Sequence, residues 1–155
     1  MDIRVECVYP NNLRYLWRIV DYLQRDAANK GARDHNKNEF RSFWNNLNQI
    51  TEDNEKVWVA LNTRNHLIGY MVLDKRLSNP DDKYNGTLNL DILEVLPRYR
   101  GKRVGHQMIA WLTERAVARG FHSIRVLPAN DSEGYWEAEG FDKWPTDHGR
   151  VLPIG

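Results

Sequence analysis

The sequence predicts an α/β protein of the α+β type, with a mixed, mostly antiparallel sheet and helices on both faces. Segments of helical periodicity and short apolar segments of strand-like pattern follow one another in the order β-α-α-β-β-β-α-β-α-β-β. The chain has 155 residues, which is enough for one core and too few for two. We therefore predict a single domain over residues 1–155.

Hydrophobic periodicity places a strand, two helices and a hairpin in the first half of the chain. Apolar residues recur at helical spacing between Leu13 and Leu23 and again between Phe40 and Ile50, and Gly31 marks the end of the first helix. The predicted bounds are strand 3–8, helix 13–31, a helix over 40–50, strands 57–61 and 66–73, and a polar loop over 74–86.

The second half is organised around a strand, a basic turn and a helix in residues 87–120. Branched apolar residues predict a strand over 87–96, and Pro97 ends it because proline has no amide hydrogen to give to a neighbouring strand. From Gly105 the spacing becomes helical and continues to Gly120, a residue typical of helix ends. The remaining predicted elements are a strand over 123–127, a short helix to about residue 139, and two short strands within 141–152.

Composition limits the classes of function that fit this chain. A net charge of +1 and a mean hydropathy of −0.69 are typical of an ordinary globular protein and give no global attraction to nucleic acid. No apolar run reaches the ~20 residues of a membrane span, and the first residues lack the apolar core of a signal peptide. A single cysteine excludes an internal disulfide framework. We expect a cytoplasmic protein without a membrane partner.

The turn before the central helix concentrates positive charge. Arg98, Arg100, Lys102 and Arg103 place four cations within six residues. A helix N-terminus has unpaired amides and a partial positive charge that attract phosphate, and Gly105 would let an anion approach the main chain. The alternative is a solvated basic connection between two elements. The strand–turn–helix context favours a pyrophosphate site.

Three segments resemble the GNAT-type acyl-CoA N-acyltransferases. Arg100-Gly-Lys-Arg-Val-Gly105 is similar to the family signature Arg/Gln-x-x-Gly-x-Gly/Ala, although Arg103 stands where the family usually has its first glycine. Leu93-Glu-Val-Leu-Pro97 resembles the end of the family's central strand, and Tyr135-Trp-Glu-Ala-Glu-Gly-Phe141 resembles its aromatic-rich helix followed by Gly-Phe. The order and spacing of the three matches make them specific. The resemblance implies a GNAT-like domain with the mixed sheet predicted above.

The resemblance also implies a co-substrate, acetyl-CoA. In the family, loop amides hold the pyrophosphate, the exposed main chain of the central strand pairs with the pantetheine arm, and a nearby amide, here of Glu94 or Val95, polarises the thioester carbonyl. The cofactor-binding residues that it indicates are Leu93, Glu94, Val95, Arg100, Gly101, Lys102, Arg103, Val104, Gly105, Asn130, Ser132 and Trp136. The histidines are scattered without metal-ligand spacing, so we expect no metal.

Two polar side chains on the central strand are candidates for deprotonating the acceptor amine. Strand periodicity puts Asn89, Asp91, Leu93 and Val95 on one face. Family members often carry a Glu or His base two to six residues before the valine position, and Asp91 and Asn89 occupy equivalent positions. An aspartate has a reference pKa near ~3.9 and needs burial to act as a base. The alternative is that Asp91 hydrogen-bonds a neighbour or attracts a cationic acceptor.

The family commonly places a tyrosine hydroxyl near the thioester sulfur, within an aromatic-Tyr-Glu run. Here the run is Tyr135-Trp136-Glu137, so tryptophan holds the family's tyrosine position. Tyr135 is displaced from that position by about 100° around a helix. We nevertheless expect Tyr135 to be the acid for the departing thiolate and Trp136 to pack against the cofactor arm. Asn130 or Ser132 would hydrogen-bond that arm.

The resulting hypothesis is an N-acetyltransferase that moves an acetyl group from acetyl-CoA to a primary amine by direct attack in a ternary complex. The alternative is a GNAT-like fold that binds acyl-CoA without catalysis, as a sensor or interaction module. The amine acceptor, a small molecule or a protein, stays open, and so does the formation of a homodimer. The near-neutral charge argues against nucleic acid as a partner of the basic turn.

Overall fold

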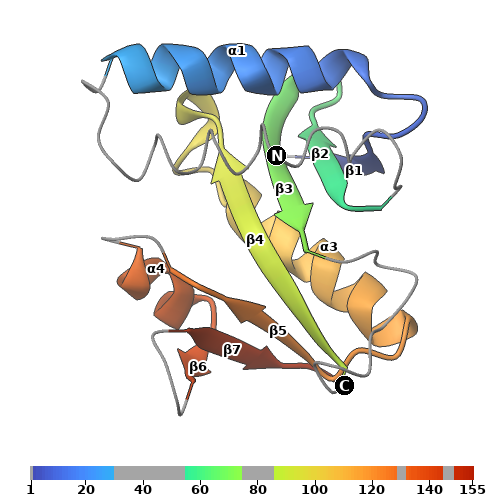
Figure 1. Cartoon of the computed structure of the whole chain (residues 1–155), viewed down its shortest axis with the longest axis vertical. Coiled ribbons are helices and arrows are strands. Elements are labelled where there is room, and N and C mark those ends of the chain that lie inside the picture. Colours follow the sequence, from blue (N-terminus) through green and yellow to red (C-terminus); the bar gives the residue numbers. More distant parts are fainter. Residues whose placement is uncertain (1, 30–54, 75–85, 129–131, 145–148) are drawn as a thin grey trace.

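Strands from the whole length of the chain form one mixed sheet (Figure 1). The computed structural model describes residues 2–29, 55–74, 86–128, 132–144 and 149–155, and within these ranges the sheet has seven strands in the order β1-β2-β3-β4-β5-β7-β6. The strands are β1 (Arg4–Cys7), β2 (Val57–Leu61), β3 (Leu67–Leu73), β4 (Thr87–Val95), β5 (Ser123–Val126), β6 (Asp142–Lys143) and β7 (Arg150–Pro153). Neighbouring strands are antiparallel except for the parallel pair β4–β5, which confirms the predicted mixed and mostly antiparallel sheet.

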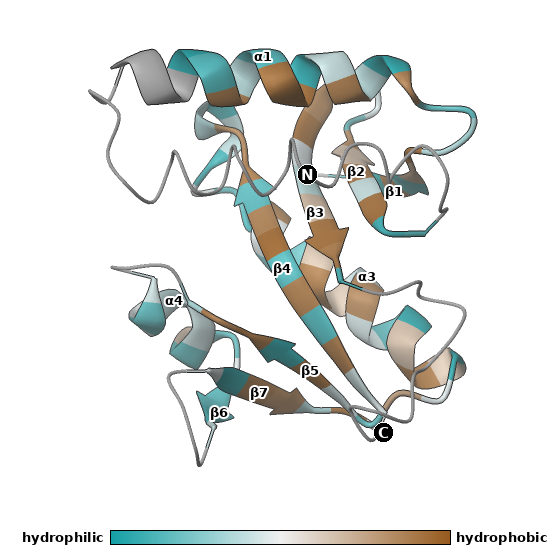
Figure 2. Cartoon of the chain, in the orientation of Figure 1, coloured by the Kyte–Doolittle hydropathy of each residue, from teal (hydrophilic) through white to brown (hydrophobic). Residues whose placement is uncertain are grey.

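Helices cover both faces of this sheet, as predicted. Helix α1 (Arg14–Asn29) buries Tyr15, Ile19 and Leu23 against one face, and burial of each such side chain contributes about 1.5–3 kcal/mol. Helix α3 (Val104–Ala118) packs against the opposite face, and α4 (Glu133–Ala138) adds one side chain to the same core. Figure 2 shows α1 hydrophilic along its outer side, while β4 alternates between hydrophobic and hydrophilic residues. None of the helices in the described part of the chain is long and apolar enough to cross a membrane.

The element boundaries agree closely with the periodicity of the sequence. The observed hairpin and central strand begin or end within one residue of their predicted bounds, and the first helix begins and ends within two. Between β4 and α3 the turn contains a short 3-10 helix, η2 (Pro97–Tyr99), which begins at the proline predicted to end the strand. The predicted helix over 40–50 and most of the predicted loop over 74–86 lie outside the described residues.

Strands β4 and β5 separate after a short paired segment, and this separation positions the site. They pair only from Thr87 with Ser123 to Leu90 with Val126. Strand β5 ends at Val126, whereas β4 continues to Val95. The last part of β4 therefore has no strand partner on its β5 side among the described residues, and Figure 1 shows the two strands diverging, with β5 running toward α4 and β4 toward α1.

An irregularity in β4 overturns one prediction about its faces. The pairing with β3 runs from Val72 with Ile92 directly to Leu73 with Leu90, so Asp91 is an extra residue in a β-bulge. Because a bulge reverses the side-chain alternation, Leu90 and Leu93 both pack in the α3 core, while Ile92 packs with the α1 core. Asn89, Asp91, Leu93 and Val95 therefore do not share one face. The bulge places Leu93 and Val95 together in the α3 core, apart from Asn89 and Asp91.

Candidate active site

A hollow of about 730 Å³ opens where β4 leaves β5, between the end of β4, the turn before α3, and α4. It has the size of a small-molecule site. Nine residues of the predicted site line it: Leu93, Glu94, Val95, Arg100, Gly101, Arg103, Val104, Gly105 and Tyr135. The structure thus brings together side chains that lie more than forty positions apart in the sequence.

The free edge of β4 faces this hollow. The amide of Leu96 donates to the carbonyl of Ile68 on β3 at 2.9 Å, which fixes the direction of every second backbone group along β4. The amides and carbonyls of Leu93 and Val95 consequently point away from β3, toward the open side. The amide of Glu94 points toward β3, so of the two amides proposed from the sequence only that of Val95 is available to a ligand.

The turn at the start of α3 has a backbone suited to an anion. Gly101 has a φ of 77°, and Arg103, the residue before the helix, has a φ of 61° and a ψ of 23°. Both values lie in the left-handed region, which glycine enters at little cost and which costs other residues about 1–2 kcal/mol. This geometry explains the glycine that the family usually has at the position of Arg103. The first amides of α3 have no acceptor within the helix and open into the hollow, so the residues present fit a diphosphate.

Arg100 is held on the edge of β4. Its Nε donates to the carbonyl of Val95 at 2.8 Å, and its Nη2 donates to Oε1 of Glu94 at 2.6 Å. The hydroxyl of Tyr22 on α1 donates to the same Glu94 oxygen at 2.9 Å. The guanidinium group therefore lies at the rim of the hollow and links α1, β4 and the turn, a network that the sequence pattern did not reveal.

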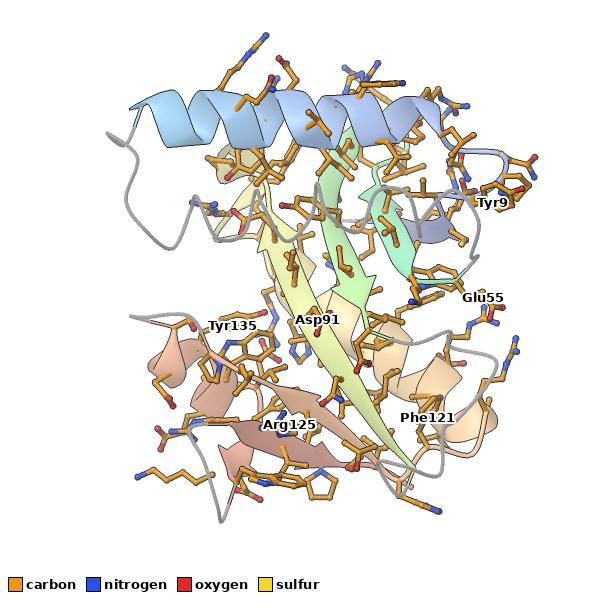
Figure 3. The ribbon with its side chains drawn as sticks, in the orientation of Figure 1. Tyr9, Glu55, Asp91, Phe121, Arg125 and Tyr135 are labelled. Carbon is orange, nitrogen blue, oxygen red and sulfur yellow. The ribbon has the colours of Figure 1, made fainter. Side chains whose placement is uncertain are left out.

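The hydroxyl of Tyr135 reaches the hollow from α4 (Figure 3). It lies so close to Gly105 that a β-carbon on that glycine would collide with it, and Val95 lies on the other side of the same small space. Burial, with a smaller contribution from the Glu139 carboxylate, raises the pKa of Tyr135 to about 12. The phenol is therefore protonated at neutral pH and can donate a hydrogen bond beside the end of β4.

Trp136 does not pack in the hollow, contrary to the prediction from the sequence. It is buried in the core, with its ring centroid 5.1 Å from that of Phe141. Neighbouring residues of a helix point in different directions, and this explains the difference from the prediction. Helix α4 turns Trp136 to the core and leaves Tyr135 on the side facing β4. Of the other residues predicted to bind the cofactor, Lys102 and Ser132 do not line the hollow, and Asn130 lies outside the described residues.

Asp91, labelled on β4 in Figure 3, and Asn89 on the same strand do not line the hollow. The side-chain amide nitrogen of Asn89 donates to Oδ2 of Asp74, the residue that follows β3, at 3.0 Å. Desolvation by burial and, to a smaller extent, the Asp74 carboxylate raise the pKa of Asp91 to about 6, whereas Lys56 lowers it. Part of the Asp91 side chain stays exposed. Asp91 therefore has the acidity of a base that works near neutral pH.

Four further residues line the hollow that were not predicted to bind the cofactor: Tyr99, His106, Ala138 and Glu139. The Nδ1 atom of His106 lies 2.8 Å from Oε2 of Glu139, which joins the start of α3 to the end of α4. Arg150 on β7, which is buried, holds the other end of α4 through Glu133. These pairs fix the helix that carries Tyr135, and they could not be found by sequence spacing because their members are far apart in the chain.

The arrangement can bind a diphosphate and polarise a carbonyl through positioned donors. It combines helix N-terminal amides, a free strand edge with an available amide, and a phenol. Within the described ranges there is no group of three or more His, Cys, Asp or Glu side chains able to hold a metal ion. Such donors are suited to acyl transfer, in which backbone amides and hydroxyls can act on the reacting group.

Comparison with known proteins identifies the class. The model of the GNAT acetyltransferase family matches residues 16–141. The chain therefore belongs to the GNAT acetyltransferase family, and it is an acyltransferase by that membership. No curated protein matches the chain in sequence.

Solved structures of low sequence identity share the fold. A GNAT-family acetyltransferase of Staphylococcus aureus is 12% identical with a TM-score of 0.69, over 99% of this chain and 100% of that one. The PaiA N-acetyltransferase of Thermoplasma acidophilum, solved in complex with coenzyme A, is 15% identical with a TM-score of 0.70, over 99% and 100% of the two chains. Tetrahymena GCN5 is 12% identical with a TM-score of 0.70, over 100% and 97%.

Proposed function

We propose that this protein is an acetyl-CoA-dependent N-acetyltransferase that acetylates a primary amine by direct attack in a ternary complex. The observation that carries the proposal is the hollow itself, where the free edge of β4, the N-terminus of α3 and the hydroxyl of Tyr135 meet. When bound, acetyl-CoA supplies an electrophilic thioester carbonyl and a thiolate leaving group.

The donor side consists of main chain and positive charge. The first amides of α3, with the cations of the turn, hold a diphosphate because they offer hydrogen-bond donors and a partial positive charge at one place. The amide and carbonyl of Leu93, which face the hollow, pair with an amide-containing arm in the manner of an added strand, while the carbonyl of Val95 is already held by Arg100 Nε. The Val95 amide is then the donor placed to stabilise negative charge on the carbonyl oxygen.

The acceptor approaches from the other side of β4. Asp91 is displaced by the bulge from the face that carries Leu93, and its neighbours Asn89 and Asp74 make that region polar and acidic. In the proposed reaction Asp91 accepts the proton that the amine loses, directly or through water, and its raised pKa makes it a better base than an ordinary aspartate. The negative charge at Asp91 and Asp74 also favours an acceptor that arrives as an ammonium ion.

Tyr135 acts on the leaving group as a hydrogen-bond donor. A phenol with a pKa of about 12 does not give up its proton to a thiolate whose conjugate acid has a pKa near ~8.5. It can still donate a hydrogen bond to the departing sulfur, and such a bond to a charged acceptor is worth about 1.5–3 kcal/mol. The role of Tyr135 is therefore stabilisation of the thiolate and not full proton transfer.

The proposal is tested by release of free thiol from acetyl-CoA in the presence of a panel of amines: polyamines, aminoglycosides, and peptides with a free N-terminus or lysine. We expect at least one amine to be acetylated, with mass spectrometry showing the added acetyl group on nitrogen. Binding of acetyl-CoA in calorimetry with no turnover across the panel would support the non-catalytic sensor instead. Absence of acetyl-CoA binding would overturn both.

A further inference from the structure

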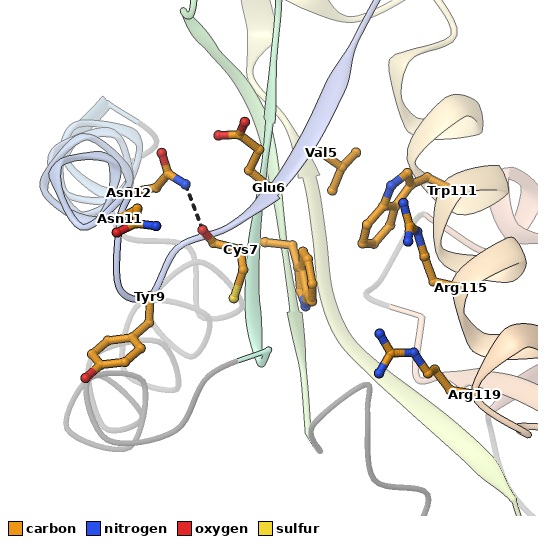
Figure 4. Close-up of a pocket in the computed structure, with 10 residues that line it drawn as sticks. Val5, Glu6, Cys7, Tyr9, Asn11, Asn12, Trp111, Arg115 and Arg119 are labelled. Carbon is orange, nitrogen blue, oxygen red and sulfur yellow. Dashed lines mark hydrogen bonds between the residues drawn. The ribbon is translucent and has the colours of Figure 1, made fainter.

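A second hollow, away from the proposed acetyl-CoA site, lies between the edge strand β1 and the C-terminal half of α3 (Figure 4). Its volume is about 470 Å³, in the range of small-molecule sites. The wall on the sheet side comes from β1 and β2, and the opposite wall comes from Trp111, Arg115 and Arg119 on α3. We call it the β1–α3 groove. None of its lining residues lines the hollow at the end of β4.

Two guanidinium groups line the α3 side of the groove. Arg115 and Arg119 are one helical turn apart and exposed, and neither forms an ion pair with a residue that the structure describes. Glu6 also lines the groove, but its carboxylate pairs with Arg4 at 2.7 Å and points away from the two arginines in Figure 4. Within the described ranges, the α3 side of the groove therefore carries two cations that no carboxylate pairs.

A pair of tryptophans forms the apolar wall between these cations and β1. The ring centroids of Trp58 and Trp111 are 4.9 Å apart, with the planes inclined at 53°. Arg115 lies over the ring of Trp111 at 5.5 Å, an arrangement that orders the guanidinium group. Cations near a helix C-terminus are common in themselves because they oppose the helix dipole. The added features here are the concave shape and the aromatic wall beside them.

We propose that the β1–α3 groove binds a small planar organic anion, an aromatic ring that carries a carboxylate or a phosphate. The flat ring would lie against Trp58 and Trp111, where offset or edge-to-face contact is favourable. The acidic group would reach Arg115 and Arg119, because a guanidinium fork matches the oxygens of carboxylate and phosphate. A cationic or neutral aromatic compound lacks the second interaction, so charge complementarity selects the anion.

The groove is a binding site without covalent chemistry in this proposal. Cys7 lines it, and burial raises the pKa of this thiol, although hydrogen bonds from neighbouring amides oppose the shift. The thiol is therefore protonated at neutral pH and is a poor nucleophile. The two hollows also use different stretches of α3: the one at the end of β4 is lined by Val104, Gly105 and His106, and the groove is lined by Trp111, Arg115 and Arg119.

Calorimetric titration with two anionic probes, 2-naphthoate and 2-naphthyl phosphate, tests this site. We expect saturable binding with a dissociation constant of about 1 mM or below for at least one of them, given their size, and the tighter probe identifies the preferred acid group. The neutral 2-naphthalenemethanol and the cationic 2-naphthylmethylamine should bind at least about tenfold more weakly. Saturating coenzyme A should leave naphthoate binding unchanged because the two hollows share no residues.

Paired variants then locate the probe. Arg115→Gln with Arg119→Gln should weaken binding about tenfold or more, and Arg119→Gln alone should weaken it in part. Arg14→Gln with Arg18→Gln removes the same charge from one turn of α1 and should leave binding unchanged. The proposal is overturned if neither probe binds, if the alcohol binds as tightly as the anions, if coenzyme A displaces the probes, or if the α3 double variant binds them as the parent does.

Discussion

Asp91 is a carboxylic acid whose surroundings disfavour its charged form, and its pKa of about 6 sets an expected pH dependence. If Asp91 is the base, it must be ionised to work, so kcat/KM should fall below about pH 6 by tenfold per pH unit. Asp91→Asn should remove this limb and lower turnover by roughly 10²–10⁴-fold, while acetyl-CoA affinity is unchanged. The measurement is a pH–rate profile of both proteins with one amine at fixed acetyl-CoA.

The control for this prediction is Asp142→Asn, which neutralises an exposed aspartate on β6. It should leave the profile as it is in the parent. A profile of Asp91→Asn with the same limb near pH 6 as the parent would exclude Asp91 as the base. Equal losses of turnover, acetyl-CoA affinity and folding stability would assign it a structural role.

The same pKa shift predicts a change in stability with pH. The folded chain keeps the Asp91 proton up to about pH 6, whereas the unfolded chain loses it near the ordinary value of 3.8. Between these values the folded state binds more protons, so the free energy of unfolding decreases as the pH rises. The side chain is exposed and screened, so this decrease should be about 1 kcal/mol or less. Urea unfolding should show Asp91→Asn equal to the parent near pH 3.5 and more stable above pH 6.5; a constant difference at all pH values would contradict this explanation.

Tyr135 and Gly105 should act as one unit, because the hydroxyl occupies the space beside the glycine. Tyr135→Phe removes the hydrogen bond to the thiolate and should lower kcat about 10–100-fold. Gly105→Ala should displace the hydroxyl and lower kcat by a similar factor, and the double variant should lose no more than either single one. Gly134→Ala, whose methyl group would meet open space on the same helix as Tyr135, is the control. Steady-state kinetics with the parent's turnover in Tyr135→Phe would end this role.

At the scale of elements, the turn between β4 and α3 determines donor binding. Arg100 lines the hollow at the edge of β4, whereas Arg98 in the same turn lines a different depression against α1. Arg100→Ala should therefore weaken acetyl-CoA binding by about tenfold or more, and Arg98→Ala should change it little. Calorimetry measures both constants. Unchanged affinity in Arg100→Ala and in Gly105→Val together would contradict the assignment of the turn.

Arg103 adds a matched pair of variants to this measurement. Arg103→Gly suits the left-handed backbone, and Arg103→Ala keeps the backbone cost while it removes the charge. If the side chain contacts phosphate, both variants lose affinity. Retained affinity in Arg103→Gly alone would show that only the backbone conformation is used at this position.

Element type and order were predictable because they depend on local patterns. Alternation, helical spacing and Pro97 indicated strands, helices and the end of β4 without any knowledge of their neighbours. The family resemblance implied an exposed main chain at Leu93 and Val95, but the separation of β4 from β5 was not predicted, since no residue in either strand marks the point where pairing stops at Leu90. Strand pairing is a property of two distant segments, and a single segment does not encode it.

The errors at the site arise from one-residue shifts that periodicity cannot detect. The bulge at Asp91 reversed the expected faces of β4, and nothing in the run from Asn89 to Val95 distinguishes a bulged strand from a regular one. The wrong placement of Trp136 has the same origin, since a rotation of about 100° per residue decides which aromatic ring is buried, whereas Tyr135 lines the hollow as expected. Both rings are aromatic, so composition alone could not assign the core position to Trp136.

In the molecule as a whole, the separation of β4 from β5 gives the two proposed substrates different routes to the end of β4. The α3 core lies on one face and the α1 core on the other, and the end of β4 carries Leu93 and Val95 toward the first and Ile92 toward the second. The proposed donor enters along the free edge of β4, and the acceptor comes past Asp91. A chain arranged in this way can hold both substrates together, which makes a covalent acyl-enzyme unnecessary.

This arrangement predicts a ternary-complex kinetic pattern that does not depend on the protein's one cysteine. Cys7 lies on β1 in the β1–α3 groove, and it does not line the hollow that holds Tyr135 and Val95. Cys7→Ser should therefore keep kcat and kcat/KM close to the parent values, and a thiol reagent that modifies Cys7 should not abolish turnover. Double-reciprocal plots at several amine concentrations should intersect, because both substrates must be bound before the acetyl group moves. Parallel lines, or an acetylated Cys7 found by mass spectrometry after incubation with acetyl-CoA alone and lost on addition of the amine, would show a covalent route and overturn direct attack.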